Sequence, residues 1–403
     1  MATPSTATTA EEEEEREAAR ENPPPPPPLP PAAAAVPATE QPQQLPPSWR
    51  LAPSQREDIF REIIFPQEIA PHLPAPSSEP LLLSPVSHHL QKQHSRRRPL
   101  AVLILGQTGA GKTRLAPLVS SALAANFSRR LGSEEKKPKE YKPVHLIADT
   151  YKTYHPFYSQ CLASYPPAQA SVLAGPDARV WLEMACQSAA EHRLDCVVES
   201  ACRHPQDFSS LATIFWEKGY SVRVAILAVP EGLSRLGCLV RYYKRLPEAG
   251  SRGLPVRLTP KRVHDESYRG CEEGAGWVDQ GKEVERVVVV RRNGGVAYEG
   301  RRDGDGGWKG KGGAKEALQR ERRRGLSEDE RRGVEGDLVF LRGLMRDGEG
   351  EGKLEGEVEE VEKLVKGLGG GSGGGEDGEG WAELEVLDAD RFVGEGLDEG
   401  GVS

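Results

Sequence analysis

The sequence predicts an α/β fold in which a parallel β-sheet is sandwiched by helices, and three observations lead to this prediction. First, four short apolar runs, LAVLIL, VHLIA, DCVVE and VRVAILAV, lack the alternation of half-exposed strands and predict strands buried on both faces. Second, apolar and small residues three and four apart predict helices between these runs, as at positions 180, 181, 184, 185, 188 and 189. Third, the first run leads directly into glycines, and α/β sheets bind ligands at the carboxyl ends of their strands.

The composition indicates one main core with long flanks, because the 403 residues include 44 Gly and 33 Pro and only 37% are hydrophobic. Residues 1–48 join an acidic block to NPPPPPPLPP, a composition typical of disordered chain. A polyproline ligand for a protein partner is the alternative for this segment. Residues 347–403 are rich in Gly and Glu and include GLGGGSGGGEDGEG, which predicts a largely flexible tail.

Residues 49–95 contain one predicted helix and a linker. In PSQREDIFREIIFP, Ser54 is expected to cap a helix with Glu57 reaching back, and the apolar positions 59, 60, 63 and 64 share one face. We expect this face to dock on the main domain, which is predicted over residues 96–270.

Residues 271–346 are predicted to form a β-hairpin and a helical extension of the main domain. Asn293-Gly294 joins two β-rich runs in VERVVVVRRNGGVAYEG, and this dipeptide is a strong hairpin signal. Ser327 and Glu330 have the spacing of a capping box ahead of an apolar stripe, which predicts the start of a helix.

Charge, cysteine usage and the lengths of the apolar runs argue against several classes of function. The formal net charge of −8 argues against nucleic-acid binding, which relies on Lys and Arg. Six cysteines without a CxxC pair favour reduced thiols over disulfides or a thiolate metal site. No apolar run approaches the ~20 residues that cross a bilayer, and the first residues lack the pattern of a secretory signal. We therefore expect a cytoplasmic protein without membrane contact, with SRRR at residues 95–98 as a candidate nuclear signal.

The segment GQTGAGKT matches the phosphate-binding pattern G-x-x-x-x-G-K-[ST], directly after a predicted strand and directly before helix-forming residues. Its backbone N–H groups are expected to surround nucleotide phosphates, and the residues involved are Gly106, Gln107, Thr108, Gly109, Ala110, Gly111, Lys112 and Thr113. In this arrangement Lys112 reaches the β- and γ-phosphates and Thr113 ligates Mg²⁺. The loop therefore predicts ATP and Mg²⁺ as cofactors.

Two carboxylates are expected beside this loop. Asp149 closes the run VHLIAD and Glu199 closes DCVVE, so that parallel strands deliver both to the same edge of the sheet. One of them could activate an acceptor hydroxyl while the other orders Mg²⁺ or the acceptor. The alternative is that each residue only caps the helix that follows it.

Arginines in the next segment are candidates for a lid over the γ-phosphate. Arg241 and Arg245 lie one helical turn apart, and Arg257 precedes Thr259 and Pro260, which look like the cap and first residue of a new helix. Cations on such a helix-loop-helix could neutralise the charge of a phosphoryl group in transit. The alternative is that they are solvated surface residues.

Taken in order and spacing, five motifs resemble the zeta toxin family of P-loop kinases over residues 96–270. They are GQTGAGKT, DTYKTYHPFY, VVESACRHP, KGYSVRVAILAVPEGLSRLGCLVRY and RLTPKRVHD. The segment from VVVVRRNGGVAYEG to the helix after Ser327 resembles, more loosely, the extended eukaryotic zeta-toxin-like proteins. The resemblance implies a P-loop kinase-like sheet and ATP-dependent phosphorylation of a sugar hydroxyl, the 3′-hydroxyl of the N-acetylglucosamine unit of UDP-N-acetylglucosamine.

The resemblance also implies roles for individual residues. Asp149 takes the place of the catalytic base, while Arg241 and Arg257 match two arginines that contact the γ-phosphate. Lys112 and Thr113 match the residues that hold phosphate and Mg²⁺.

Three matched positions, Glu199, Lys152 and Arg203, are assigned by the resemblance to acceptor binding. Lys152 stands where many family members carry Arg, and a lysine cannot reproduce a bidentate guanidinium contact. The sequence Glu199-Ser200-Ala201 stands where they carry Glu-Gly-Thr. The residues implied in phosphoryl transfer thus match the family pattern, whereas the residues implied in acceptor binding depart from it.

The leading functional hypothesis is a kinase that acts on a hydroxyl of a small molecule. A second hypothesis is an ATP-binding interaction or switch protein with negligible turnover, suggested by the long Pro-rich and Gly/Glu-rich flanks. A third is a nucleic-acid end kinase, which the acidic net charge disfavours.

Overall fold

The computed structural model describes residues 50–73, 98–130, 141–164, 167–252, 258–303, 306–309, 312–346, 353–368 and 384–394. The chain divides into two units, Met1–Pro47 and Ser48–Ser403, and all described residues belong to the second. The predictions for residues 1–48, for most of the linker before residue 96 and for Arg257 lie outside the described residues.

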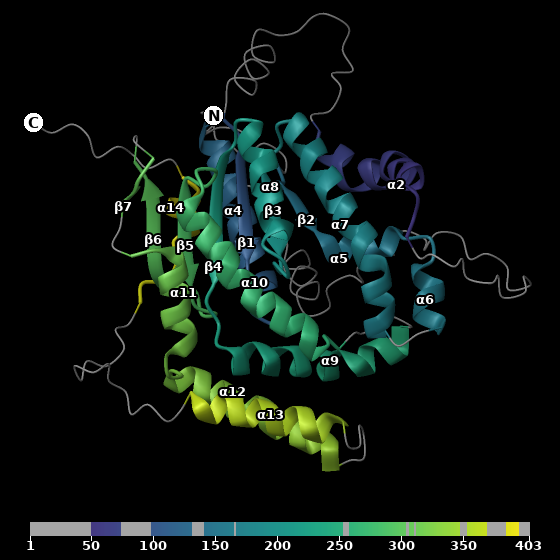
Figure 1. Ribbon diagram of the computed structural model, residues 1–403, viewed down its shortest axis with the longest axis vertical. Helices are drawn as coiled ribbons and strands as arrows, with labels where there is room; N and C mark the ends of the chain where they lie inside the picture. Colours follow the sequence, from purple (N-terminus) through teal and green to yellow (C-terminus); the bar gives the residue numbers. More distant parts are fainter. Residues whose placement is uncertain are drawn as a thin grey trace, which may run out of the picture. The chain divides into compact units, whose positions relative to one another are not determined.

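A seven-stranded sheet forms the centre of the fold, with the strand order β2-β3-β1-β4-β5-β6-β7 (Figure 1). The strands are β1 (Leu100–Leu105), β2 (Val144–Ile147), β3 (Cys196–Ser200), β4 (Ser221–Leu227), β5 (Arg286–Val290), β6 (Val296–Arg302) and β7 (Trp308–Lys309). Strands β1 to β4 are parallel, as predicted. Strand β5, predicted only as one arm of the hairpin, also runs parallel to β4, and β6 and β7 add an antiparallel edge. The four apolar runs of the sequence coincide with β1 to β4 to within two residues at each end.

Helices connect the strands and cover both faces of the sheet. Before β3 these are α2 (Pro53–Ile59), the π-helix η1 (Phe60–Ile69), η2 (Ala70–His72), α4 (Lys112–Arg130), α5 (Ala148–Tyr151), η3 (Lys152–Tyr154), α6 (Tyr158–Ser164) and α7 (Pro167–Glu191). After β3 they are α8 (Gln206–Glu217), α9 (Glu231–Arg252), α10 (Lys261–Gln280), α11 (Ala314–Arg323), α12 (Glu328–Arg346), α13 (Lys353–Gly367) and α14 (Ala389–Val393).

Two apolar layers hold the sheet between these helices. Leu103 of β1 packs in the layer that contains α7, α8 and α10, whereas its neighbour Ile104 packs with α4, α9 and α13. Every residue of β1 is buried, because it lies at the centre of the sheet with helices on both sides. This explains why its sequence shows no alternation of apolar and polar residues.

The N-terminal helix docks on α7, as predicted, but its cap is different. Helix α2 begins at Pro53, and the Ala52 N–H donates to the side chain of Gln55 at 2.9 Å, so Ser54 is not the cap. Of the predicted face, Phe60 and Ile64 are buried in the layer that contains α7 and Ile59 is partly buried, whereas Ile63 is exposed. The Trp181 indole N–H of α7 donates to the Arg56 carbonyl at 3.0 Å, which fixes the contact.

The hairpin and the capping box of the extension are both confirmed. Strands β5 and β6 pair antiparallel around a turn in which Gly294 has φ +92°, a conformation that favours glycine. At the start of α12, the Glu330 N–H donates to Ser327 Oγ at 3.2 Å, and the Ser327 N–H donates to Glu330 Oε2 at 3.0 Å. Because β5 pairs with β4, the extension continues the central sheet.

Two segments of the predicted flexible tail are helical, which differs from the sequence prediction. Helix α13 packs on α9 and buries Leu354, Val358 and Val361, and α14 packs on α4 with Phe392 and Val393 buried. The apolar residues of α13 recur at helical spacing among glutamates, and the Gly- and Glu-rich average composition hid this stripe.

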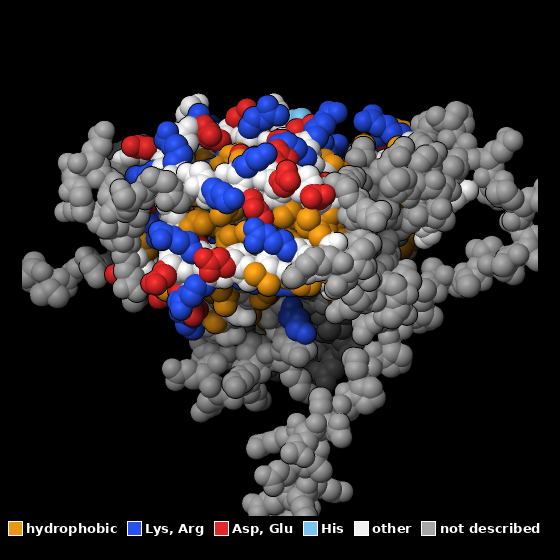
Figure 2. All heavy atoms as spheres, turned by 90° about the horizontal axis from the view of Figure 1, so that it is seen from below, with side chains coloured by type: hydrophobic (Ala, Val, Ile, Leu, Met, Phe, Trp, Pro, Cys, Tyr) orange, Lys and Arg blue, Asp and Glu red, His pale blue; other side chains and the backbone are white. Residues whose placement is uncertain are grey.

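Figure 2 views the side of the molecule on which α12 and α13 lie, and it shows basic and acidic side chains interspersed over apolar ones. An ion pair of 2.6 Å between Arg342 and Glu362 joins these two helices. Within the described residues, no helix combines the length and the apolar character needed to span a bilayer.

Candidate functional site

The predicted phosphate loop lies between the carboxyl end of β1 and the first residue of α4. Gly109 has φ +80° and Gly111 has φ +106°, values that L side chains rarely adopt. A Cβ atom added to Gly109 would lie 2.1 Å from the carbonyl oxygen of Ser234 in α9. Glycine is therefore required at this position by both backbone conformation and close approach to α9.

Lys112 folds back over the loop that precedes it. Its Nζ donates to the Gly106 carbonyl at 2.6 Å and lies 3.3 Å from the Gln107 carbonyl. Burial lowers the pKa of Lys112, while the negative charges of Glu199 and Asp149 act in the opposite direction. A phosphate group bound in the loop would favour the charged ammonium and offset the cost of desolvation.

The charges of the two predicted carboxylates, Glu199 and Asp149, thus both act to raise the pKa of Lys112. Their environments differ. Strand β2 ends at Ile147, two residues earlier than the run VHLIAD suggested, and Asp149 lies in the first turn of α5. The Asp149 side chain is 65% exposed, and Lys152 Nζ donates to its Oδ1 at 2.6 Å. Asp149 and Lys152, predicted as base and acceptor ligand, are therefore in direct contact.

Glu199 is buried on β3, with only 5% of its side chain exposed. Its Oε1 lies 3.0 Å from Nε2 of His145 on the neighbouring strand β2, and the His145 side chain is 40% exposed. Sequence reasoning missed His145, although it stands in the middle of the predicted strand VHLIA. The buried Glu199 carboxylate and the half-exposed His145 imidazole thus form a polar pair across two neighbouring strands.

Arg203, predicted to bind the acceptor, forms an ion pair with Glu266 of α10 through Nε at 3.0 Å. Arg262 also donates to Glu266, at 2.7 Å. The hydrogen bonds from Arg262 and then Arg203 lower the pKa of Glu266 to about 2, so that the carboxylate stays ionised.

Arg241 lies exposed on α9, and its Nη2 is 3.4 Å from Oγ1 of Thr259. Its helix, α9, approaches the loop directly, because a Cβ atom on Gly109 would lie 2.1 Å from the Ser234 carbonyl oxygen. The predicted cap of the next helix is wrong by one residue, since α10 begins at Lys261 and Thr259 does not cap it. The Thr259 hydroxyl faces Arg241 instead, within the stretch predicted to form a lid.

Two arginines of the extension hold the phosphate loop, and sequence reasoning missed both. Arg292, in the β5–β6 turn, donates through Nη2 to the carbonyls of Gly109 at 2.5 Å and Leu233 at 3.0 Å. Desolvation lowers the pKa of Arg292. Arg322 of α11 donates to the buried side-chain carbonyl of Gln107 at 3.0 Å. The loop is therefore held partly by residues that follow it by 183 and 215 positions.

The Gln107 side chain ties the loop to α9. Its Nε2 donates to the Val229 carbonyl at 2.7 Å and lies 3.3 Å from Ser234 Oγ. Ser234 is in turn hydrogen-bonded to His264 Nε2 at 2.8 Å, and burial lowers the pKa of His264 to about 4. His264 also forms, with Glu231 and Asp265, a group whose ligand atoms lie within 4.8 Å of one another and could hold a metal ion.

Thr113, the predicted Mg²⁺ ligand, is the second residue of α4 and its side chain is exposed. Ala110 is buried and its N–H donates to the Gln107 carbonyl at 3.1 Å, while the Thr108 N–H donates to Ser267 Oγ at 3.3 Å. Strands β1, β2 and β3 are neighbours in register, so the loop after β1, Glu199 on β3, and Asp149 and Lys152 after β2 lie at the same end of the sheet.

Comparison with known proteins gives the following matches. A family model described as zeta toxin matches residues 86–303, more than half of the chain. Toxin PezT of Streptococcus pneumoniae serotype 4 is 24% identical over 206 residues, covering 51% of this chain and 73% of PezT. Toxin zeta of Streptococcus pyogenes is 24% identical over 176 residues, covering 44% of this chain and 54% of that protein. The solved structure of the PezAT chromosomal toxin-antitoxin system of S. pneumoniae is 17% identical, covers 65% of this chain and 96% of that chain, and gives a TM-score of 0.47.

Proposed function

The chain belongs to the zeta toxin family, and from this premise we propose that it is an ATP-dependent kinase that phosphorylates a hydroxyl of a small molecule. The observation that carries the proposal is the loop itself, with Lys112 folded over it and two carboxylates within its electrostatic range. Such a loop binds nucleotide phosphates, and a transfer reaction additionally needs a group that orients the acceptor.

In this proposal residues 106–111 surround the ATP phosphates with backbone N–H groups, and the amino-terminal end of α4 adds its positive dipole. Lys112 exchanges its contact with the Gly106 carbonyl for the β- and γ-phosphate oxygens. The exposed hydroxyl of Thr113 fits a Mg²⁺ ion, which takes oxygen ligands and retains several waters. Mg²⁺ would supply charge neutralisation between the phosphates.

Asp149 is the proposed general base, because its exposed carboxylate can accept the proton of an acceptor hydroxyl. Lys152 holds one carboxylate oxygen at 2.6 Å and orients the group. Arg241, together with Arg257, is proposed to neutralise charge on the transferred phosphoryl group. The Arg241 contact of 3.4 Å to Thr259 is long, so the guanidinium can turn toward phosphate at little cost.

The proposed acceptor is a nucleotide sugar such as UDP-N-acetylglucosamine, with Glu199, Lys152 and Arg203 at its binding site. Support for this choice comes from the motif resemblance. The pairs Glu199–His145 and Arg203–Glu266 give the acceptor side hydrogen-bonding groups already fixed in place. A carboxylate beside an imidazole suits the hydroxyls of a sugar, which both donate and accept hydrogen bonds.

ADP release by the full chain, measured against nucleotide sugars, nucleosides and oligonucleotides, tests the proposal. A kinase releases ADP in proportion to one acceptor class, and we expect this class to be nucleotide sugars. ATP binding without acceptor-dependent ADP release would contradict the proposal and favour a nucleotide-gated switch. Acceptor-dependent release with oligonucleotides alone would instead assign a nucleic-acid end kinase.

Asp149→Asn tests the base directly. We expect ATP affinity close to that of the wild type and a single-turnover transfer rate lower by roughly 10²- to 10⁴-fold, the usual worth of a positioned base. Asp329→Asn is a matched control, because Asp329 also lies in the first turn of a helix and pairs with a cation three residues later. Equal transfer rates in the two variants would remove Asp149 from the mechanism.

A further inference from the structure

Helix α10 contacts both the phosphate loop and the segment that follows β3, and one serine makes both contacts. Ser267 is fully buried. Its Oγ donates to the Ala201 carbonyl at 2.5 Å and accepts the Thr108 N–H of the phosphate loop at 3.3 Å. A hydroxyl has one proton to donate and lone pairs that accept, so both hydrogen bonds can form at once. A single oxygen atom thus joins the loop after β1 to the segment after β3.

The segment after β3 lies against one helical turn of α10. A Cβ atom on Gly270 would lie 2.0 Å from the Cys202 carbonyl oxygen, so the two backbones are in direct contact. Cys202 Sγ donates to the Gly270 carbonyl at 3.2 Å. Arg203 forms its ion pair with Glu266, the residue before Ser267. The segment and this turn of α10 are therefore held together at several points.

The backbone of this segment is also strained. Cys202 has φ +48°, in the left-handed region that non-glycine residues rarely adopt. Such a conformation persists only where the surrounding structure fixes it, and it is frequent at functional sites. The Cys202 N–H donates to Ser200 Oγ at 3.1 Å, which helps to fix the turn. This turn sets the direction of the chain between Glu199 and Arg203, the two residues proposed to bind the acceptor.

The same turn of α10 is linked to the phosphate loop at a second point. Arg322 Nη1 donates to the Tyr268 carbonyl at 2.8 Å, and its Nη2 donates to the Gln107 side chain at 3.0 Å. The Arg322 guanidinium lies over the Tyr268 ring, 3.8 Å from the centroid. Gln107 and Thr108 are consecutive in the loop, as Ser267 and Tyr268 are in α10. The loop therefore cannot shift along α10 without breaking one of these contacts.

We propose that Ser267 is a positioning residue for phosphoryl transfer, which fixes the ATP in the phosphate loop relative to the acceptor held by residues 199–203. This inference rests on the proposed kinase reaction. In that reaction the acceptor oxygen bonds to the γ-phosphorus while the bond to the ADP oxygen breaks, and the hydroxyl proton passes to Asp149. Ser267 is buried away from both substrates and acts through Thr108 and Ala201. A misplacement of about 1 Å can slow such a reaction about 10²-fold.

Ser267→Ala tests the proposal through two rates measured on the same full chain. One is transfer to the acceptor that gives the fastest ADP release among nucleotide sugars, nucleosides and oligonucleotides, and the other is ATP hydrolysis without acceptor. Water is not held by residues 199–203, so hydrolysis does not depend on the alignment that Ser267 provides. We expect the ratio of transfer to hydrolysis to fall at least about tenfold. The acceptor KM should stay unchanged, because the lost interaction acts on alignment and not on binding.

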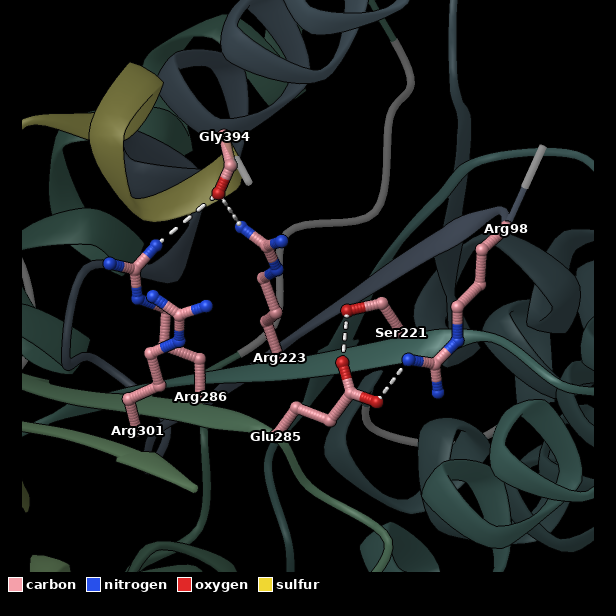
Figure 3. A pocket seen from close by; sticks show the side chains of 7 residues that line it. All are labelled: Arg98, Ser221, Arg223, Glu285, Arg286, Arg301 and Gly394. Carbon is pink, nitrogen blue, oxygen red and sulfur yellow. Dashed lines mark hydrogen bonds and ion pairs between the residues drawn. The ribbon is translucent and has the colours of Figure 1, made fainter. Parts of the chain in front are cut away.

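Ser221→Ala is the matched control, because it also removes a buried serine hydroxyl that donates a hydrogen bond. Ser221 is 7% exposed, and its Oγ donates to Glu285 at 2.6 Å in a polar pocket of about 210 Å³ (Figure 3). Ser221 begins β4 and pairs in register with Leu100, the first residue of β1, so the length of β1 separates it from the phosphate loop. This variant should keep the wild-type ratio even if its Tm falls.

An unchanged ratio in Ser267→Ala, or an equal fall of both rates, would overturn the proposal, because the serine would then only stabilise α10. A higher acceptor KM with unchanged kcat would also overturn it and assign Ser267 to acceptor binding. Ser267→Cys, whose thiol is a weaker donor, is the second variant and should give an intermediate ratio. If the wild-type chain released no ADP with any acceptor, the proposed function itself would be refuted, and this inference with it.

Discussion

Replacing Gly109 by alanine tests how closely the phosphate loop approaches α9. The new Cβ would lie 2.1 Å from the Ser234 carbonyl oxygen and 2.8 Å from Cys238 Sγ, both on α9. The cysteine side chain can rotate, but the carbonyl belongs to a helix backbone and cannot. The loop must therefore move away from α9, and its N–H groups move with it.

The size of the effect follows from two contributions. A non-glycine residue at φ +80° costs roughly 1–2 kcal/mol. Overpacking against a rigid neighbour adds about 1–3 kcal/mol. Gly219→Ala isolates the first contribution, because Gly219 has φ +77° and a Cβ there would meet no atom within 4 Å. We expect Gly109→Ala to lower the free energy of unfolding by about 1–3 kcal/mol more than Gly219→Ala does.

Urea denaturation of both variants at equal m-values gives the difference in stability, and nucleotide titration reports on the loop. Gly109→Ala is expected to lose ATP affinity while Gly219→Ala retains it. If both variants unfold at the same urea concentration and bind ATP equally well, the loop does not contact α9 as described.

Two further predictions concern residues that support the loop. Arg292→Ala should lower ATP affinity about tenfold, because it removes the side chain that joins the Gly109 carbonyl of the loop to the Leu233 carbonyl of α9. Arg320→Ala, which removes only an exposed contact of 3.3 Å to a carbonyl, is the control and should bind ATP normally. For His264, whose pKa is lowered from 6.5 to about 4 in the folded state, the unfolded chain takes up the proton first as the pH falls. The free energy of unfolding should therefore decline by about 3 kcal/mol between pH 6.5 and 4 and be unaffected by this group above 6.5. His264→Gln should flatten that decline in urea titrations at each pH, and an unchanged slope would show that His264 is not buried as a neutral side chain.

Local patterns in the sequence predicted the local parts of this fold well. The run LAVLIL is β1 itself, and the Ser327–Glu330 capping box forms because its two hydrogen bonds span only three residues. The GQTGAGKT motif likewise predicts a strand before it, a turn at its glycines and a helix after it, and all three are present.

The parts that sequence reasoning missed depend on contacts between distant segments. Nothing near Arg292 or Arg322 indicates that each donates to the loop at residues 106–111, because the strand order decides this. His145 gains its partner Glu199 only when β2 pairs with β3. Helix α13 was missed because its apolar stripe is diluted by glutamates and followed by a glycine-rich segment.

The position of Arg292 and Arg322 late in the sequence decides when, during synthesis, the phosphate loop gains these two donors. A ribosome completes the GQTGAGKT segment long before it reaches either arginine, and β1 must wait for β3 and β4 to emerge before it has neighbours on both sides. A nascent chain that stops at residue 270 therefore contains every matched motif yet lacks β5 and both donors to the loop. Full nucleotide affinity should then develop only near the end of translation, when the last third of the chain has left the exit tunnel.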